Sequence, residues 1–227
     1  MNARLKTNTK TPACACVIGG TMVHTKEGLI AIDKLKVSDW VLSRPENPGD
    51  GTEPSYKRVV NTFRHEAREI VEFTYEIGDN LNPYKNKHYQ VTATLNHLLW
   101  VMGEGWTSVE KLNDGRDHRP SFVLTDGAPS FAGTFSRIYR TNVPDRGWVA
   151  THGIYGPGDL LEYGSVPKCI ESSVEFDREN WPGDVVDDDI FQPFQTTVYN
   201  IEVEDFHTYF VGEHGTWVHD ATCARIK

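Results

Sequence analysis

The sequence predicts an all-β protein. Many short runs are rich in Val, Ile, Thr, Tyr and Phe, and apolar and polar residues alternate in them with period two, as in half-buried strands. Gly, Pro, Asn and Asp separate these runs every 8–12 residues or so, which is the usual spacing of turns in all-β proteins. Almost no stretch shows the 3.6-residue period of an amphipathic helix. Together these observations favour an all-β fold.

Ordered structure is expected to begin at Cys16. Residues 1–13 are mostly polar and lack periodicity, and we expect a flexible N-terminal flank over 1–15. The apolar run 17–23 follows, interrupted by two glycines that let backbone pass close to a neighbour. Short helical turns are expected at 33–37 and 108–112. The strands expected in this half of the chain are 29–32, 39–43, 57–64, 69–76, 89–93 and 98–101.

The pattern loosens between residues 115 and 195, where Gly, Pro and Asp are frequent, and we expect an irregular insertion there. Its acidic run 184–189 is interpreted as a solvated loop, with a metal site as the weaker alternative. Order is expected to return at Thr196, with strands at 198–203, 206–211 and 217–219. A tight turn at Glu204-Asp205 would join the first two of these strands, and residues 221–227 form a C-terminal flank.

Composition excludes several classes of function. The 227 residues carry a net charge of −9 and scattered basic residues, which argues against nucleic-acid binding. No apolar run approaches the roughly 18 residues of a membrane span, and the polar N-terminus lacks the apolar segment of a secretory signal. Four cysteines are too few for a disulfide framework. A zinc site that combines Cys14 and Cys16 with His24 or His97 is a weak alternative.

Three separated clusters carry the candidate chemistry. The first is Cys16, at the boundary between the flank and the first strand. The second is Thr94-Leu95-Asn96-His97, in a turn between strands. The third is His207 with His219-Asp220, at the end of the ordered part. One cysteine and several histidines are the parts of nucleophilic acyl chemistry.

The position of Cys16 predicts a reaction in cis. Its thiol can reach the carbonyl carbon of the preceding residue, Ala15, and exchange the peptide bond for a thioester. Holding the groups in place can supply on the order of 7–11 kcal/mol of the barrier. We expect His97 to protonate the leaving nitrogen, while Thr94 and nearby backbone N–H groups hold the oxyanion. At the other end, cyclisation of Asp220 onto its own carbonyl would break the 220–221 bond, assisted by His207 and His219.

Four blocks in this order resemble the Hint (hedgehog/intein) superfamily. They are CVIGGTMVHTKEG at 16–28 with IDKLKVSDWVLS at 32–43, TLNH at 94–97 before LLWV, VYNIEVEDFHTYFV at 198–211, and VHD at 218–220. The residues of these blocks are most similar to those of pretoxin Hint domains of bacterial polymorphic toxins and of bacterial intein-like domains. The resemblance covers about 16–112 and 196–220. It implies a compact, pseudo-two-fold, horseshoe-like all-β domain over 16–220 whose two ends meet at the active site.

The sequence departs from this pattern at three positions. Asp220 replaces the usual terminal Asn, so that ring closure would give an anhydride in place of a succinimide. Whether this Asp is native, engineered or a deamidated Asn is left open. Ala221 cannot accept an acyl group as Cys, Ser or Thr would, so we expect cleavage with little or no ligation. Asn200 stands where inteins often carry Asp, and it can orient groups but cannot act as a base.

The sequence therefore predicts a self-cleaving domain with single-turnover chemistry, a thioester at Cys16 and no cofactor or metal. Its partners would be the flanking segments of its own precursor, such as a downstream toxin, and we expect a monomer. The cellular location stays open; the resemblance implies a bacterial toxin precursor, cytoplasmic or exported. Two alternatives remain: a β-rich linker or interaction module with weakened catalysis, and a trans-acting cysteine hydrolase.

Overall fold

The computed structural model describes residues 15–47, 53–78, 86–113, 119–126, 128–151, 157–164, 167–174 and 192–220. Within these ranges the regular structure is almost entirely β, as predicted, with two short 3₁₀ helices, η1 (Ile32–Lys34) and η3 (Val109–Asn113). Both lie at or next to the expected helical turns. The flanks 1–14 and 221–227 and the acidic run 184–189 lie outside the described residues.

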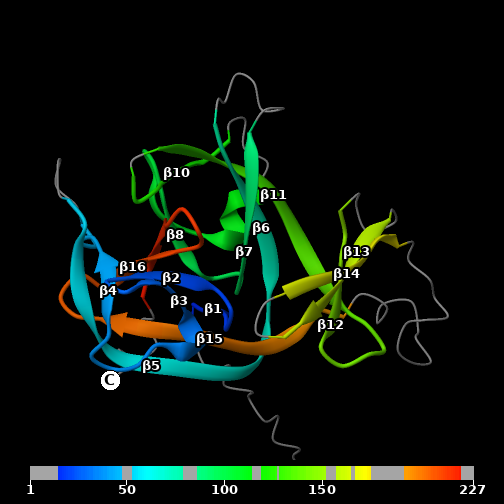
Figure 1. The fold of residues 1–227 in the computed structure, drawn as a ribbon. Helices are drawn as coiled ribbons and strands as arrows, with labels where there is room; N and C mark the ends of the chain where they lie inside the picture. Colours follow the sequence, from blue (N-terminus) through cyan, green and yellow to red (C-terminus); the bar gives the residue numbers. More distant parts are fainter. Residues whose placement is uncertain are drawn as a thin grey trace, which may run out of the picture.

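Seventeen strands are present in the described part of the chain (Figure 1). In chain order they are β1 (Val17–Ile18), β2 (Met22–Thr25), β3 (Gly28–Ala31), β4 (Trp40–Ser43), β5 (Ser55–Glu69), β6 (Val71–Ile77), β7 (Lys87–Ala93), β8 (Leu98–Val101), β9 (Gly105–Ser108), β10 (Ser121–Val123), β11 (Pro129–Arg140), β12 (Arg146–Val149), β13 (Gly158–Tyr163), β14 (Pro167–Val174), β15 (Gln195–Val203), β16 (Thr208–Val211) and β17 (Thr216–His219).

The short strand β1 brings distant parts of the chain together. Val17 pairs with Tyr199 of β15 on one side and with Ala93 of β7 on the other. β15 in turn pairs along most of its length with the long strand β5, and the two run together along the lower edge of the molecule in Figure 1. The residue that precedes β1, Cys16, therefore lies between the end of β7 and the middle of β15.

The C-terminal strand closes the structure beside the same place. β17 pairs with β16 through Thr208 and His219, and with β8 through Val218 and Leu99. β8 directly follows the turn that carries His97. The first and last described segments of the chain therefore both border the β7–β8 turn.

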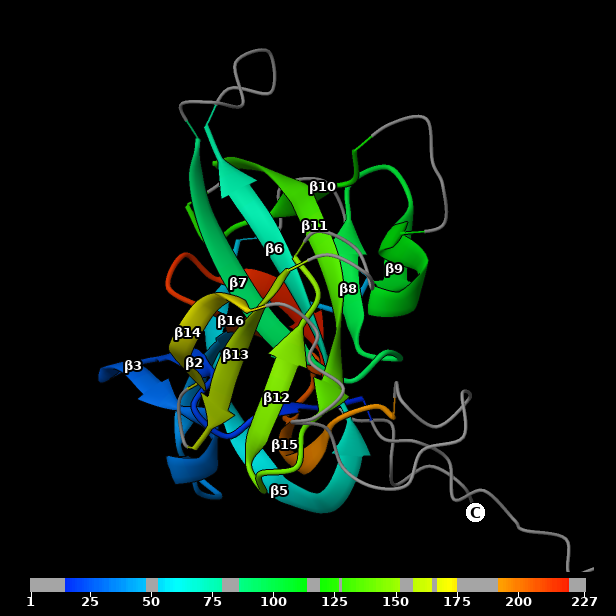
Figure 2. The ribbon, with the colours of Figure 1, turned by 90° about the vertical axis from the view of Figure 1, so that its right-hand side faces the viewer.

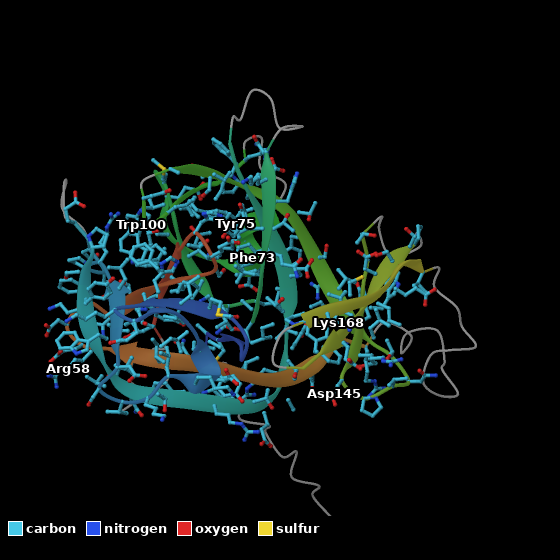
Figure 3. All side chains as sticks on the ribbon, in the orientation of Figure 1. Arg58, Phe73, Tyr75, Trp100, Asp145 and Lys168 are labelled. Atoms are coloured by element: carbon cyan, nitrogen blue, oxygen red, sulfur yellow. The ribbon has the colours of Figure 1, made fainter. Side chains whose placement is uncertain are left out.

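Alternation along the strands produces the main core. In β6, the buried Val71, Phe73 and Tyr75 alternate with the less buried Glu72 and Thr74. The apolar side chains pack against one another, and their removal from water stabilises the sheet. Figure 3 shows Phe73 and Tyr75 at the centre of the molecule.

The segment 115–195 differs from the expectation of irregular structure. In its described parts, β10 and β11 join the main sheet by pairing with β8 and β6. The end of β11 then continues into a second antiparallel sheet with β12, β13 and β14. This second sheet faces the viewer in Figure 2 and carries Lys168, which Figure 3 labels. The register of β11 shifts between Ala132 and Phe135, and β14 is exposed along most of its length, so that neither strand shows a regular period in the sequence.

A second hydrophobic core lies between the second sheet and the main body, and it includes Cys16. The second sheet and Phe194, which directly precedes β15, contribute the buried residues Ile138, Val149, Leu161, Tyr163 and Phe194. They pack in one cluster with Cys16, Ile18, Ile70 and Val198 of the main body. The side chains of the second sheet thus take part in burying the candidate nucleophile.

Candidate functional site

Cys16 is held by its backbone against Thr94. The Cys16 N–H donates to the Thr94 hydroxyl oxygen at 3.0 Å, and the Thr94 N–H donates to the Cys16 carbonyl at 2.9 Å. Both residues are buried. Thr94 was expected to hold the oxyanion of Ala15, but its hydroxyl instead contacts the amide nitrogen of the Ala15–Cys16 bond. In this position it fixes the nitrogen that would leave when that bond breaks.

The carbonyl oxygen of Ala15 receives its hydrogen bond from the side chain of Asn200, whose Nδ2 donates to it. The orientation of this amide is fixed from its other end, because Asn200 Oδ1 accepts from the Tyr209 hydroxyl at 2.9 Å and from the Ile201 N–H at 2.7 Å. With Oδ1 occupied in this way, the NH₂ group must face Ala15. Asn200 is therefore a functional candidate whose donor role the sequence did not reveal.

His97 lies between the two ends of the site. Its backbone is fixed in the turn, since its N–H donates to Thr94 O at 3.0 Å and its carbonyl accepts from Val109 at 2.9 Å. The side chain is fully buried, and neither ring nitrogen has a hydrogen-bond partner among the described residues. Burial, together with the nearby charge of His219, lowers the pKa of His97 to about 3, against a smaller opposing effect of the Ala15 carbonyl.

The neutral ring of His97 can both donate and accept a proton. The charge of His219 and the carbonyl of Ala15 both act on the pKa of His97, so the ring lies near both halves of the site. A histidine in this position can receive a proton from one group and deliver it to another. The expected role as the acid for the leaving nitrogen thus requires His97 to be charged only transiently.

The Cys16 thiol is fully buried. Burial raises the pKa of the thiol to about 12, although the positive charge of Arg68 opposes the shift. The sulfur is therefore protonated at neutral pH in this conformation, and it becomes a nucleophile only when the proton leaves as the sulfur attacks.

Asp220 is held at the other end through its main chain and its carboxylate. Its carbonyl oxygen accepts from His219 Nδ1 at 2.8 Å, and its N–H donates to the carbonyl of His207 at 2.8 Å. Its carboxylate oxygen Oδ2 accepts from the Val203 N–H at 3.0 Å and from His207 Nδ1 at 3.3 Å. Asp220 is 3% exposed, so these contacts replace the water that a carboxylate would otherwise bind.

The turn between β15 and β16 positions His207. Its φ of 54° lies in the left-handed region, as does the φ of 61° at Asp205. This backbone path directs both the carbonyl and the ring of His207 at Asp220. Strained residues of this kind persist where the surrounding structure holds them, and they often occur at functional sites.

His219 is charged at neutral pH. Its Nε2 donates to the carboxylate of Glu46 at 2.9 Å, while its Nδ1 donates to the Asp220 carbonyl. Burial alone would lower the pKa of His219, but the hydrogen bonds to Asp220 and Glu46 outweigh it and raise the pKa to about 9. An imidazolium that donates to a carbonyl oxygen withdraws electrons from the carbonyl carbon and makes it more susceptible to attack.

The six residues singled out in the sequence are thus brought into one region. Cys16 and Thr94 lie at one end, His207, His219 and Asp220 lie at the other, and His97 connects them. Tyr209 lies near both ends as well. Burial raises the pKa of its hydroxyl, and the nearby Cys16 and Asp220 both add to the rise. Within the described residues, no cluster of three or more His, Cys, Asp or Glu side chains is arranged to hold a metal ion, and no helix is long and apolar enough to span a membrane.

A solved bacterial intein-like domain shares this architecture. The chain resembles the bacterial intein-like domain from Clostridium thermocellum with a TM-score of 0.54 and 19% identity over 91% of this chain and 99% of that one. The fold is the intein-like Hint fold. Weaker similarities include the DnaB intein from Synechocystis sp. PCC 6803, with a TM-score of 0.47, 10% identity and coverage of 91% and 98%, and the gp41-1 intein, with 0.44, 13% and the same coverage. No protein family and no curated protein sequence matches the chain.

The expected all-β Hint architecture is therefore confirmed. At 19% identity the likeness concerns the fold, and the narrower similarity to pretoxin Hint domains stays a prediction. The roles of the individual side chains rest on the geometry described above.

Proposed function

We propose that this chain is a self-processing Hint domain that cleaves its own backbone in cis, at Ala15–Cys16 and after Asp220. One observation carries the proposal. Two peptide carbonyls that lie far apart in the sequence, those of Ala15 and Asp220, each receive a side-chain hydrogen bond, from Asn200 and His219, in one buried region. A donor aimed at a carbonyl oxygen stabilises the negative charge that develops there during acyl transfer.

At the first bond, the Cys16 sulfur attacks the carbonyl carbon of Ala15. A C–S bond forms, the C–N bond breaks, and the Cys16 nitrogen leaves as an amine. The proton lost by the thiol reaches this nitrogen through His97, so that no net charge is created. Water or an added thiol then cleaves the thioester and releases residues 1–15.

At the second bond, a carboxylate oxygen of Asp220 attacks the carbonyl carbon of the same residue. The C–N bond to Ala221 breaks, and the new amine takes a proton from the His219 imidazolium. The resulting cyclic anhydride is hydrolysed by water, which restores two carboxyl groups. Ala221 offers no hydroxyl or thiol to receive the acyl group, so the flanks separate with little or no ligation. In a longer precursor the released downstream segment would be the cargo, such as a toxin.

Intact mass spectrometry of the 227-residue chain tests the proposal. Thiol addition is expected to produce time-dependent loss of residues 1–15 that Cys16→Ala abolishes. Loss of residues 221–227 is expected to be slow, and Asp220→Asn should accelerate it because an amide closes to a succinimide more readily. If neither the wild-type chain nor Asp220→Asn loses either flank, and Cys16→Ala behaves identically, the proposed function is wrong.

Two observations favour a second candidate, a Hint-fold module with weakened catalysis. Asp220 must close through a carboxylate to an anhydride, which is the poorer reaction, and the Cys16 thiol is protonated. Such a module would bind a partner or join domains without cutting itself. The same mass measurement separates the two candidates. A trans-acting hydrolase is disfavoured, because the buried Cys16 offers no access to an external substrate.

A further inference from the structure

Glu46 makes a contact that no sequence motif indicates. It follows strand β4 and lies 173 residues before His219, yet its Oε1 is 2.9 Å from His219 Nε2. The other ring nitrogen of His219 is 2.8 Å from the carbonyl oxygen of Asp220. A carboxylate and a carbonyl can only accept hydrogen bonds, so both ring nitrogens must carry protons.

Strand β9 holds this arrangement in place. The indole Nε1 of Trp106 donates to the backbone carbonyl of Glu46 at 3.0 Å. The same indole ring meets the His219 ring edge to face, with centroids 5.0 Å apart and an angle of 79° between the planes. One side chain therefore fixes the segment that carries the Glu46 carboxylate and the imidazole ring of His219 relative to each other.

The geometry points to Glu46 as a positioning residue for C-terminal cleavage: it keeps His219 charged and directs the Nδ1–H at the carbonyl oxygen of Asp220. This inference rests on the proposed function. A hydrogen-bond partner on the second ring nitrogen fixes the tautomer and the orientation of a histidine at reactive sites. Without the carboxylate, a neutral His219 could place its single proton on either nitrogen, and the Asp220 carbonyl would lose its donor in one of the two forms.

The other charged or titratable groups around His219 do not replace Glu46. Asp220 faces the ring from the same strand end, with its Oδ1 3.5 Å from Nδ1, but it is the reacting residue. His207 binds the Asp220 carboxylate, and it adds no negative charge. His97 lies near His219 and is neutral, because burial holds its pKa low. Glu46 is therefore the carboxylate that can keep the imidazolium charged until it gives its proton to the leaving amine.

If Glu46 had a purely structural role, its main effect would be on the stability of the fold. The Glu46 side chain is 39% exposed, whereas His219 is 7% exposed. Partly exposed ion pairs contribute little to the stability of a fold. The effect of Glu46 is accordingly expected mainly in the protonation and orientation of His219, and its change in the free energy of unfolding should be no larger than the shift of the His219 pKa implies.

The test compares Glu46→Gln with the wild-type 227-residue chain. The glutamine can still accept a hydrogen bond from Nε2 through its amide oxygen, but it lacks the charge. NMR titration of the His219 ring nitrogens should give a pKa near 9 for the wild type and a value lower by about one unit or more for Glu46→Gln. Glu46→Asp should restore part of the shift. Glu53→Gln, an exposed position that precedes β5, removes the same charge and should leave the pKa of His219 unchanged.

The rate of loss of residues 221–227, measured in both the Asp220 chain and the Asp220→Asn chain, provides the second readout. As pH rises, this rate should fall when His219 loses its proton, and in Glu46→Gln the fall should begin about one pH unit lower. An unchanged His219 pKa in Glu46→Gln, or an equal shift in Glu53→Gln, overturns the inference. If neither chain loses the flank at any pH, the proposed function fails at this end, while the NMR titration still decides whether Glu46 keeps His219 charged.

Discussion

Truncation of Asn200 to Ala removes the side-chain donor from the carbonyl of Ala15. Asn200 Nδ2 donates to this oxygen, and the amide is fixed by Tyr209 and by the backbone N–H of Ile201. The donor is therefore in place before the reaction starts and needs no rearrangement as charge develops on the oxygen. Preorganised donors of this kind are the ones that lower an acyl-transfer barrier.

Loss of one such donor typically slows acyl transfer by about 10²–10³-fold, which corresponds to about 2.7–4 kcal/mol. We expect Asn200→Ala to slow thiol-induced loss of residues 1–15 by that factor. Intact mass spectrometry over time gives the rate. Loss of residues 221–227 should change much less, because the Asp220 carbonyl has its own donor in His219.

Tyr209→Phe is the matched control. Asn200 is 1% exposed, so its truncation leaves the buried Tyr209 hydroxyl without the Asn200 oxygen and should cost about 1–3 kcal/mol of unfolding free energy. Tyr209→Phe breaks the same hydrogen bond but keeps the Nδ2 donor. It should therefore lose some stability and cleave within about tenfold of the wild-type rate, since the oxyanion donor that accounts for the larger factor remains. Wild-type cleavage by Asn200→Ala, or equal slowing in both variants, would refute the role of Asn200.

Three further outcomes concern the buried groups. The pKa of His97 is about 3 in the folded protein and 6.5 when unperturbed, so the unfolded chain takes up the proton first as pH falls. The free energy of unfolding, measured with urea, should therefore fall by roughly 3 kcal/mol between pH 7 and 4, and His97→Asn should lack this loss. In the native protein, Cys16 should react with iodoacetamide at least about 100-fold more slowly than the exposed Cys169, as read by peptide mass mapping, and denaturant should remove the difference. Leu161→Ala, in the core that covers Cys16, should cost about 2–4 kcal/mol in urea unfolding and accelerate alkylation of Cys16; unchanged alkylation would mean that the second sheet does not protect the thiol.

Local patterns in the sequence were sufficient for much of the fold. The alternation in β6 and β7 predicted two strands, and the turn signals predicted that Thr94 to His97 would lie between β7 and β8. Each of these inferences depends on residues that are close in the sequence, so that period and turn chemistry alone can establish them. That the separated site residues would meet was implied by the resemblance of the four blocks to the Hint superfamily and by no local pattern.

The parts that could not be predicted depend on pairing between distant strands. Val17 lies opposite Tyr199 in the register of β1 and β15, and one further step along both strands places Cys16 beside Asn200. Nothing in either strand alone specifies this register. The contact of Glu46 with His219 arises in the same way, because it depends on how the segment after β4 packs against β9 and β17.

The two ends of the site are limited by different factors. At the N-terminal end the nucleophile is good but protonated, because burial raises the pKa of Cys16 to about 12. At the C-terminal end the carbonyl is already polarised by a charged His219, while the attacking group, the carboxylate of Asp220, is poor. Exposure of the thiol should therefore accelerate only the first cleavage, and Asp220→Asn only the second. Independent responses of this kind are expected because each carbonyl has its own donor, Asn200 or His219, and because the described residues that lie near both ends, His97 and Tyr209, are neutral.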